Sequence, residues 1–184
     1  MRAEIKRLHQ RLKNTIVYVT HDQVEAMTLA DKIVIMKDGR IEQQGTPDEV
    51  FHDPDTLFVA GFMGSPPMNL IDCTVTEAGI RLSQTEIPCT VPGRVAPGTR
   101  LVFGMRSDDI RPTDEGAEGV STDMQIDLIE QFGTENLVHF RLGPDAMIGK
   151  TGGRTHIAPG QTTPFTLQMQ HAYFFDPATG LRVQ

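Results

Sequence analysis

The 184-residue chain has no tryptophan, few aromatic residues (6%) and only two cysteines, and each shortage excludes a class of protein. Lys and Arg number 17 against 24 acidic residues, a net charge of −7. This balance disfavours a nucleic-acid partner, which needs a basic patch with aromatic stacking platforms. No apolar run approaches the roughly 20 residues that span a bilayer. Cys73 and Cys89 are too few for a disulfide framework. The composition predicts a globular protein of one domain or two small ones, located in the cytoplasm.

The sequence also lacks the motifs with which P-loop enzymes hold and hydrolyse ATP. It contains no G-x-x-x-x-G-K-[ST] loop, no L-S-G-G-Q-like signature and no apolar strand ending in Asp-Glu. Hydrolysis by such enzymes needs a glycine-rich loop with a lysine, an aspartate for Mg²⁺ and a residue that positions water. We therefore expect the chain alone to have no ATPase activity.

The most informative stretch that is present is residues 15–22, Thr-Ile-Val-Tyr-Val-Thr-His-Asp. Its β-branched and aromatic run is too short for a helix and predicts a strand over 15–20 that is buried on both faces. His21 would then lie at the carboxyl end of a parallel strand. Ligands of open α/β sheets collect at that edge.

A helix is expected to begin directly after His21. Asp22 is predicted to cap it, with Glu25 closing a capping box. The helix N-terminus would place His21 where phosphate groups are favoured. Asp22 and Glu25 are also potential metal ligands, but helix capping explains both residues, and we favour it.

The rest of the first part alternates helix and hairpin signals. Leucine and isoleucine at helical spacing predict a helix over 2–13 that packs on the sheet. Asp38-Gly39 predicts a tight turn between strands 32–37 and 40–44. Thr46, Pro47 and Glu49 have the pattern of a helix start. A short helix is expected over 55–63.

The character of the sequence changes near Gly64-Ser65-Pro66-Pro67, which is the best candidate for a domain boundary. After it, short alternating runs are punctuated by Gly and Pro, a pattern typical of a small barrel. The expected strands are 69–76, 80–83, 100–105, 124–130, 137–142, 164–168 and 172–175.

Several segments carry a resemblance to a known family, including 129–133 and 174–180. Residues 15–47, which run from Thr-Ile-Val-Tyr-Val-Thr-His-Asp-Gln to Gln-Gly-Thr-Pro, closely resemble the switch-histidine region of ABC-transporter ATPase subunits, nearest to the sugar and glycerol-3-phosphate importers. The resemblance continues through Phe-Val-Ala-Gly-Phe-Met-Gly-Ser-Pro-Pro-Met-Asn at 58–69. Phe-Gly-Met-Arg-Ser-Asp-Asp-Ile-Arg-Pro at 103–112 is similar to the family segment G-I-R-P-E-x-I, from which Met105 and Ser107 depart.

The resemblance implies an α+β chain with two domains. Residues 1–64 would be the carboxyl-terminal remnant of an α/β P-loop nucleotide-binding domain, whose missing motifs lie upstream in the family. Residues 65–184 would be an all-β, OB-like (TOBE-type) regulatory barrel. Such a subunit hydrolyses ATP with Mg²⁺ to drive uptake of a sugar or glycerol phosphate, and His21 would be the catalytic residue that contacts the γ-phosphate.

The resemblance also implies partners and a location. The complete subunit would form a homodimer, bind transmembrane permease subunits and sit peripherally on the cytoplasmic face of the inner membrane. A regulatory protein or small ligand would bind the barrel. The cargo stays open, because other components of such importers select it.

Other polar residues have weaker functional signals. Asp108-Asp109 could form an acid–base pair, although a solvated acidic turn is the simpler interpretation. Arg106 matches the arginine of the family segment and could bridge barrel strands or contact a second copy. The cysteines lack basic neighbours in the sequence, which favours inert packing. No metal-ligand spacing occurs among the remaining histidines, which are His9, His52, His139, His156 and His171.

An alternative function is a stand-alone binding module in which the barrel holds a small ligand, an oligosaccharide or a regulatory protein. It predicts specific binding without nucleotide. Nucleic-acid binding by the barrel is a third and weaker hypothesis, disfavoured by the acidic charge.

Overall fold

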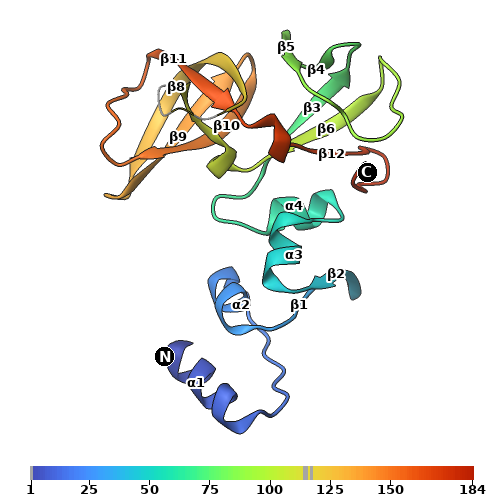
Figure 1. The fold of residues 1–184 in the computed structure, drawn as a ribbon, viewed down its shortest axis with the longest axis vertical. Coiled ribbons are helices and arrows are strands. Elements are labelled where there is room, and N and C mark those ends of the chain that lie inside the picture. The colour runs from blue at the N-terminus through green and yellow to red at the C-terminus, as the bar shows by residue number, and fades with distance from the viewer. Residues whose placement is uncertain (1, 114–115, 117) are drawn as a thin grey trace. The chain divides into compact units, whose positions relative to one another are not determined.

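The computed structural model describes residues 2–113, 116 and 118–184. The chain divides between Gly64 and Ser65 into two compact units, which are described separately below as unit 1 (residues 1–64) and unit 2 (residues 65–184). Figure 1 labels their elements.

Unit 1 combines four short helices with one hairpin. The two strands pair antiparallel, and both turn residues have positive φ (Asp38 49°, Gly39 77°), the geometry of a type I′ turn. The predicted hairpin is therefore confirmed. The elements are α1 (Arg2–Leu12), α2 (Gln23–Leu29), β1 (Ile33–Lys37), β2 (Arg40–Gly45), α3 (Pro47–His52) and α4 (Leu57–Phe62).

The strand expected over 15–20 does not form, and that prediction was wrong. Residues 13–20 have no helix or strand assignment, and the apolar side chains Val17 and Val19 are 89% and 91% exposed. A strand of a sheet needs a neighbour to pair its backbone N–H and C=O groups. Among the described residues, no segment pairs with 15–20, so the sequence preference for a strand is not realised.

The core of unit 1 is small and lies between the hairpin and the last two helices. Ile33 and Ile35 pack against Val50, Val59 and Met63. On the other side of the hairpin the apolar side chains Val34, Met36 and Ile41 are about half exposed. The hairpin therefore buries one face and leaves the other open.

The first helix packs differently from the prediction. Its main contact is with α2, and Lys6 donates from Nζ to the carbonyl of Thr28 at 2.9 Å. Leu8 and Leu12 remain 44% and 50% exposed. The amphipathic stripe that predicted this helix therefore lies largely uncovered in the chain.

The described residues of unit 2 form two five-stranded antiparallel sheets and include the 3₁₀ turns η1 (Ser107–Asp109) and η3 (Met169–His171). Their strand orders are β10-β9-β8-β11-β7 and β12-β6-β3-β4-β5. All seven predicted strands are present within a few residues, whereas β5, β7 and β10 were not predicted. The strands are β3 (Asn69–Val75), β4 (Gly79–Leu82), β5 (Thr85–Pro88), β6 (Arg100–Met105), β7 (Ile110–Pro112), β8 (Val120–Gln131), β9 (Glu135–Leu142), β10 (Asp145–Gly152), β11 (Thr162–Leu167) and β12 (Tyr173–Phe175).

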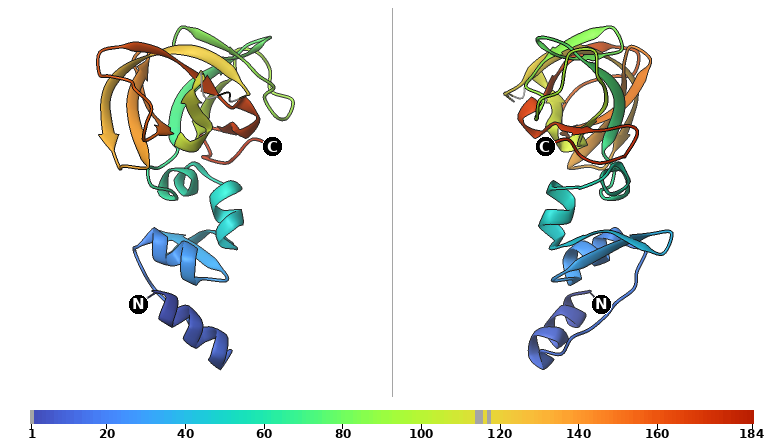
Figure 2. Two further views of the ribbon diagram at one scale, coloured as in Figure 1. Left: turned by 60° about the vertical axis from the view of Figure 1, so that its left-hand side comes forward. Right: turned by 90° about the vertical axis from the view of Figure 1, so that its right-hand side faces the viewer.

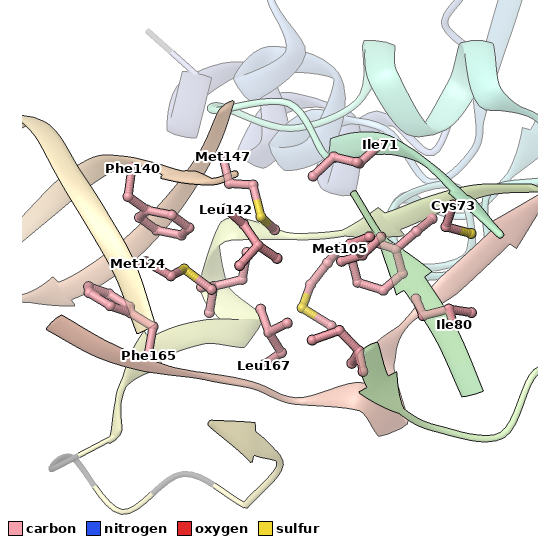
Figure 3. Close-up of a cluster of buried hydrophobic side chains, with 14 of the residues drawn as sticks. Ile71, Cys73, Ile80, Met105, Met124, Phe140, Leu142, Met147, Phe165 and Leu167 are labelled. Carbon is pink, nitrogen blue, oxygen red and sulfur yellow. The ribbon is translucent and has the colours of Figure 1, made fainter. Parts of the chain in front are cut away.

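Both sheets of unit 2 contribute to one apolar core. The turned views of Figure 2 show the strands curving around a common interior. In Figure 3, Phe140 and Phe165 lie beside Met124 at one end of this core, and Ile80 lies toward the other. The rings of Phe140 and Phe165 have their centroids 5.0 Å apart. Unit 2 is thus mostly β with a continuous core, as its alternating sequence predicts.

The described residues contain no helix that is both long enough and apolar enough to cross a membrane. Every strand pair in the same residues is antiparallel. The parallel sheet expected around residues 15–22 is therefore not found in the described residues of unit 1. The assignment of unit 1 to a P-loop domain remains a proposal.

Candidate functional site

His21 lies in a bend two residues before the start of α2, the helix labelled in Figure 1, and it is exposed. In the described part of the chain, no hydrogen bond or ion pair engages its imidazole. The ring is therefore available to a group approaching from outside unit 1.

The residues around His21 form a local hydrogen-bond network that begins α2. Asp22 caps the helix, accepting at Oδ1 from the backbone N–H of Val24 (2.8 Å) and Glu25 (3.2 Å). The hydroxyl of Thr20 accepts from the N–H of Asp22 (2.9 Å) and donates to Glu25 Oε2 (2.9 Å). Tyr18 donates to the same carboxylate oxygen at 3.0 Å. The segment before the helix is thus ordered without being a strand.

This network corrects the predicted capping box. Glu25 does not reach back to the backbone of Asp22, because Thr20 already bonds that N–H and Glu25 accepts from Thr20 and Tyr18 instead. The hydrogen bond to the Glu25 carboxylate raises the pKa of the Tyr18 phenol, since only the protonated phenol can donate.

The network also limits what the start of α2 can offer a phosphate. Two of its first N–H groups, those of Val24 and Glu25, are already bonded to the Asp22 carboxylate. An anion near this end would also meet the negative charges of Asp22 and Glu25. A phosphate contact here therefore depends on the His21 side chain and not on the helix N-terminus.

Gln23, the first residue of α2, has a role that the sequence did not indicate. Its side-chain Nε2 donates to the carbonyl of Phe62, and its Oε1 accepts from the N–H of Gly64 at 2.9 Å. These bonds join the start of α2 to the end of unit 1. No local sequence pattern predicts a contact between residues about 40 positions apart.

Asp108 and Asp109, the candidate acid–base pair of unit 2, are engaged by different partners. Lys150 Nζ donates to Asp108 Oδ1 at 2.9 Å, and His171 Nδ1 lies 2.6 Å from Asp109 Oδ1. Each carboxylate thus has its own cation or imidazole. This arrangement favours the interpretation that they fix η1, and it gives no shared proton site.

Arg106 precedes η1 and is buried, with 4% of its surface exposed. Burial lowers the pKa of its guanidinium, and the charges of Tyr173, Asp109 and Asp108 oppose that shift. The side chain thus lies largely inside unit 2, and strand bridging and contact with a second copy both stay predictions.

The cysteines and histidines form no further reactive site. Burial raises the pKa of the Cys73 thiol to about 11 and also raises that of Cys89, so both favour the unreactive thiol. Among the described residues, no three His, Cys, Asp or Glu side chains come together in a way that could hold a metal ion.

The described part of unit 2 includes a hollow of about 310 Å³. It lies between the loop after β5 and η3. Its lining is mainly apolar and carries no charged side chain: Cys89, Thr90, Pro92, Met169, Gln170, Ala172 and Phe174. This volume is at the lower end for small-molecule pockets.

Comparisons with known proteins bear on both units. A family model described as the MalK OB fold domain matches residues 64–110. The sn-glycerol-3-phosphate import ATP-binding protein UgpC of Chromobacterium violaceum is 39% identical over 189 residues, covering 100% of this chain and 50% of that protein. UgpC of Yersinia pestis is 41% identical over 187 residues, covering 100% and 52%. The ABC transporter ATP-binding protein y4oS of Sinorhizobium fredii is 40% identical over 187 residues, covering 100% and 49%.

Along its whole length the chain is similar to ATP-binding proteins of ABC importers. It spans about half the length of the curated relatives it matches. The OB-fold match extends from the last residue of unit 1 through β3–β6 to the start of β7. A crystal structure of the cytoplasmic molybdate-binding protein ModG aligns with 59% of the chain and 96% of its own, at TM-score 0.49 and 13% identity, a likeness too low to support a shared function.

Proposed function

We propose that the chain forms the carboxyl-terminal part of the ATP-hydrolysing subunit of an ABC importer for a sugar or glycerol phosphate. Residues 1–64 would complete the nucleotide-binding domain, and residues 65–184 would form its OB-like regulatory domain. The observation that carries this proposal is the identity of about 40% along the whole chain to import ATP-binding proteins.

Within this proposal, His21 is the residue of the chain that meets the nucleotide. ATP and Mg²⁺, when bound by the rest of the subunit, supply the phosphoryl group and neutralise part of its charge. The exposed imidazole donates a hydrogen bond to the γ-phosphate and so stabilises charge that develops on it. The Asp22 cap holds the start of α2, which fixes the backbone next to this ring.

The proposed partners are a second copy of the subunit and the transmembrane permease subunits, on the cytoplasmic face of the inner membrane. On unit 2, Leu128 and Phe132 are 52% and 59% exposed on and beside β8, and they offer apolar surface to such a contact. The hollow beside η3 is the candidate place for a small regulatory ligand.

ATP turnover tests the proposal directly. The 184-residue chain is assayed alone and after it is joined to the nucleotide-binding half of a relative that carries the P-loop. We expect no turnover from the chain alone and turnover at least a hundredfold above background from the joined protein. Turnover by the chain alone, or none by a folded joined protein, contradicts the proposal.

A further inference from the structure

The side chain of Gln23 uses both ends of its carboxamide at one place. Nε2 donates to the carbonyl of Phe62, and Oε1 accepts from the backbone N–H of Gly64 at 2.9 Å. A glutamine is the neutral side chain of this length that carries a donor and an acceptor together. Replacement by any apolar residue therefore breaks both links.

The partners of Gln23 belong to a well-fixed element. Phe62 is the last residue of α4, where carbonyl groups lack partners within the helix. The same helix is anchored by Val59 and Ala60, which are fully buried, and by its C-cap Met63, which is 2% exposed. The end of α4 is thus a rigid point in unit 1.

The helix that Gln23 begins is held less firmly by packing. No residue of α2 is buried, and Val24 is 50% exposed. Only Ala26 and Met27 reach the core of unit 1, from partly buried positions. The hydrogen bonds of Tyr18 and Thr20 to Glu25 tie α2 to the segment directly before it and not to the core of unit 1. The Gln23 carboxamide therefore contributes strongly to the position of this end of α2.

We propose that Gln23 is a positioning residue, which sets the place of His21 relative to the end of α4 and to Gly64, where the chain leaves unit 1. Gln23 follows His21 by two positions, and Asp22 between them is held by its capping bonds. A shift of α2 thus moves the imidazole. The effect of Gln23 on catalysis rests on the proposed function of His21. The effect of Gln23 on the position of the imidazole does not.

The simpler interpretation is that Gln23 only caps α4. In that case its loss changes the stability of α4 and leaves His21 in place. The two interpretations differ in a measurable quantity, which is the environment of the His21 ring.

Nuclear magnetic resonance of the 184-residue chain separates them. In Q23L we expect the Gly64 amide to exchange at least tenfold faster and the His21 ring resonances to shift. The matched control is T46A, which removes a helix cap elsewhere in unit 1 and should leave both signals unchanged. A Gly64 amide that responds while the His21 ring does not would reduce Gln23 to a cap and overturn the proposal.

A second variant keeps the test decisive if Q23L unfolds unit 1. Q23E can still accept from Gly64 but cannot donate to Phe62. We expect its His21 ring to shift while the Gly64 amide stays protected. An unmoved ring in Q23E contradicts the proposal.

The catalytic consequence is measured in the joined ATPase. We expect Q23L to lower kcat about tenfold with the KM for ATP within twofold of the parent. A displaced His21 imidazole reduces the rate of the chemical step more than it weakens the binding of ATP. If H21A is impaired and Q23L is not, the positioning role fails alone. If neither is impaired, the proposed function of His21 fails as well.

Discussion

At the scale of single residues, Asn69 joins the two sheets of unit 2. From β3 its Nδ2 donates to the carbonyls of Met105 (3.0 Å) and Ile148 (2.9 Å), and its Oδ1 accepts from the N–H of Ile148 (2.7 Å). Met105 belongs to the same sheet as Asn69, whereas Ile148 lies on β10 of the other. One buried amide thus satisfies three backbone groups across the core.

Replacement of Asn69 by Ala should destabilise unit 2 strongly. It leaves buried backbone groups of Ile148 and Met105 without these partners, which we expect to lower the free energy of unfolding by about 2–4 kcal/mol. Urea denaturation measures the change. The control is Q84A at an exposed position, expected within about 0.5 kcal/mol of the parent. Equal stability of the two variants would contradict this role.

The Cys73 thiol should make unit 2 less stable at alkaline pH. Its pKa is raised by burial from 9.0 to about 11, so the native state keeps a proton that the unfolded chain loses between these values. Stability falls with rising pH wherever the native state binds more protons. Cys89 and Tyr18 are shifted in the same direction, so the comparison must be made with C73V.

Urea denaturation at pH 8, 9, 10 and 11 tests this prediction. We expect the parent to lose more stability than C73V from about pH 9 to 11. Parallel profiles for the two proteins would show that Cys73 does not carry the effect.

At the scale of elements, local sequence signals succeeded where the structure they predict is itself local. The Asp38-Gly39 turn and the capping box of α3 need only neighbouring residues, and both are present. The strand over 15–20 failed because pairing requires a second strand. Strand β10 was missed for the opposite reason: Ala, Gly and Lys give it little intrinsic preference, and its pairing with β9 creates it.

The start of α3 provides a test at this scale. Thr46 Oγ1 accepts from the N–H of Glu49 (3.2 Å), and Glu49 Oε2 accepts from the N–H of Thr46 (2.7 Å). We expect T46A to lower the free energy of unfolding of unit 1 by about 1 kcal/mol. Chemical denaturation followed through unit 1 measures it. T15A, which changes an exposed threonine outside any helix, is the control, and a T46A loss no larger than that of T15A would refute the prediction.

The same cap should depend on pH. Hydrogen bonds from the backbone and hydroxyl of Thr46 lower the pKa of the Glu49 carboxyl. The stabilisation is present above the ordinary pKa of a glutamate and is lost as the pH falls through the lowered value. The difference between the parent and T46A should therefore shrink in acid.

At the scale of the whole molecule, the sequence indicated the all-β character of unit 2 and the place where the chain changes character. The sequence did not predict contacts between residues that are distant in the chain. Gln23 with Phe62 and Gly64, and Asn69 with Ile148, join residues 39 to 79 positions apart. No periodicity encodes such pairs, because they depend on how complete elements pack. The role of His21 was predicted from its neighbours in the chain, whereas Gln23, the residue proposed to position it, was not predicted.

The most direct measurement is the kcat of the joined ATPase with His21 replaced by Ala. The control is H52A, an exposed histidine on α3 outside the proposed contact. If the imidazole of His21 stabilises charge on the γ-phosphate, H21A should lower kcat by about two to three orders of magnitude. H52A should stay within about twofold of the parent. A kcat of H21A within about threefold of the parent would contradict the assignment.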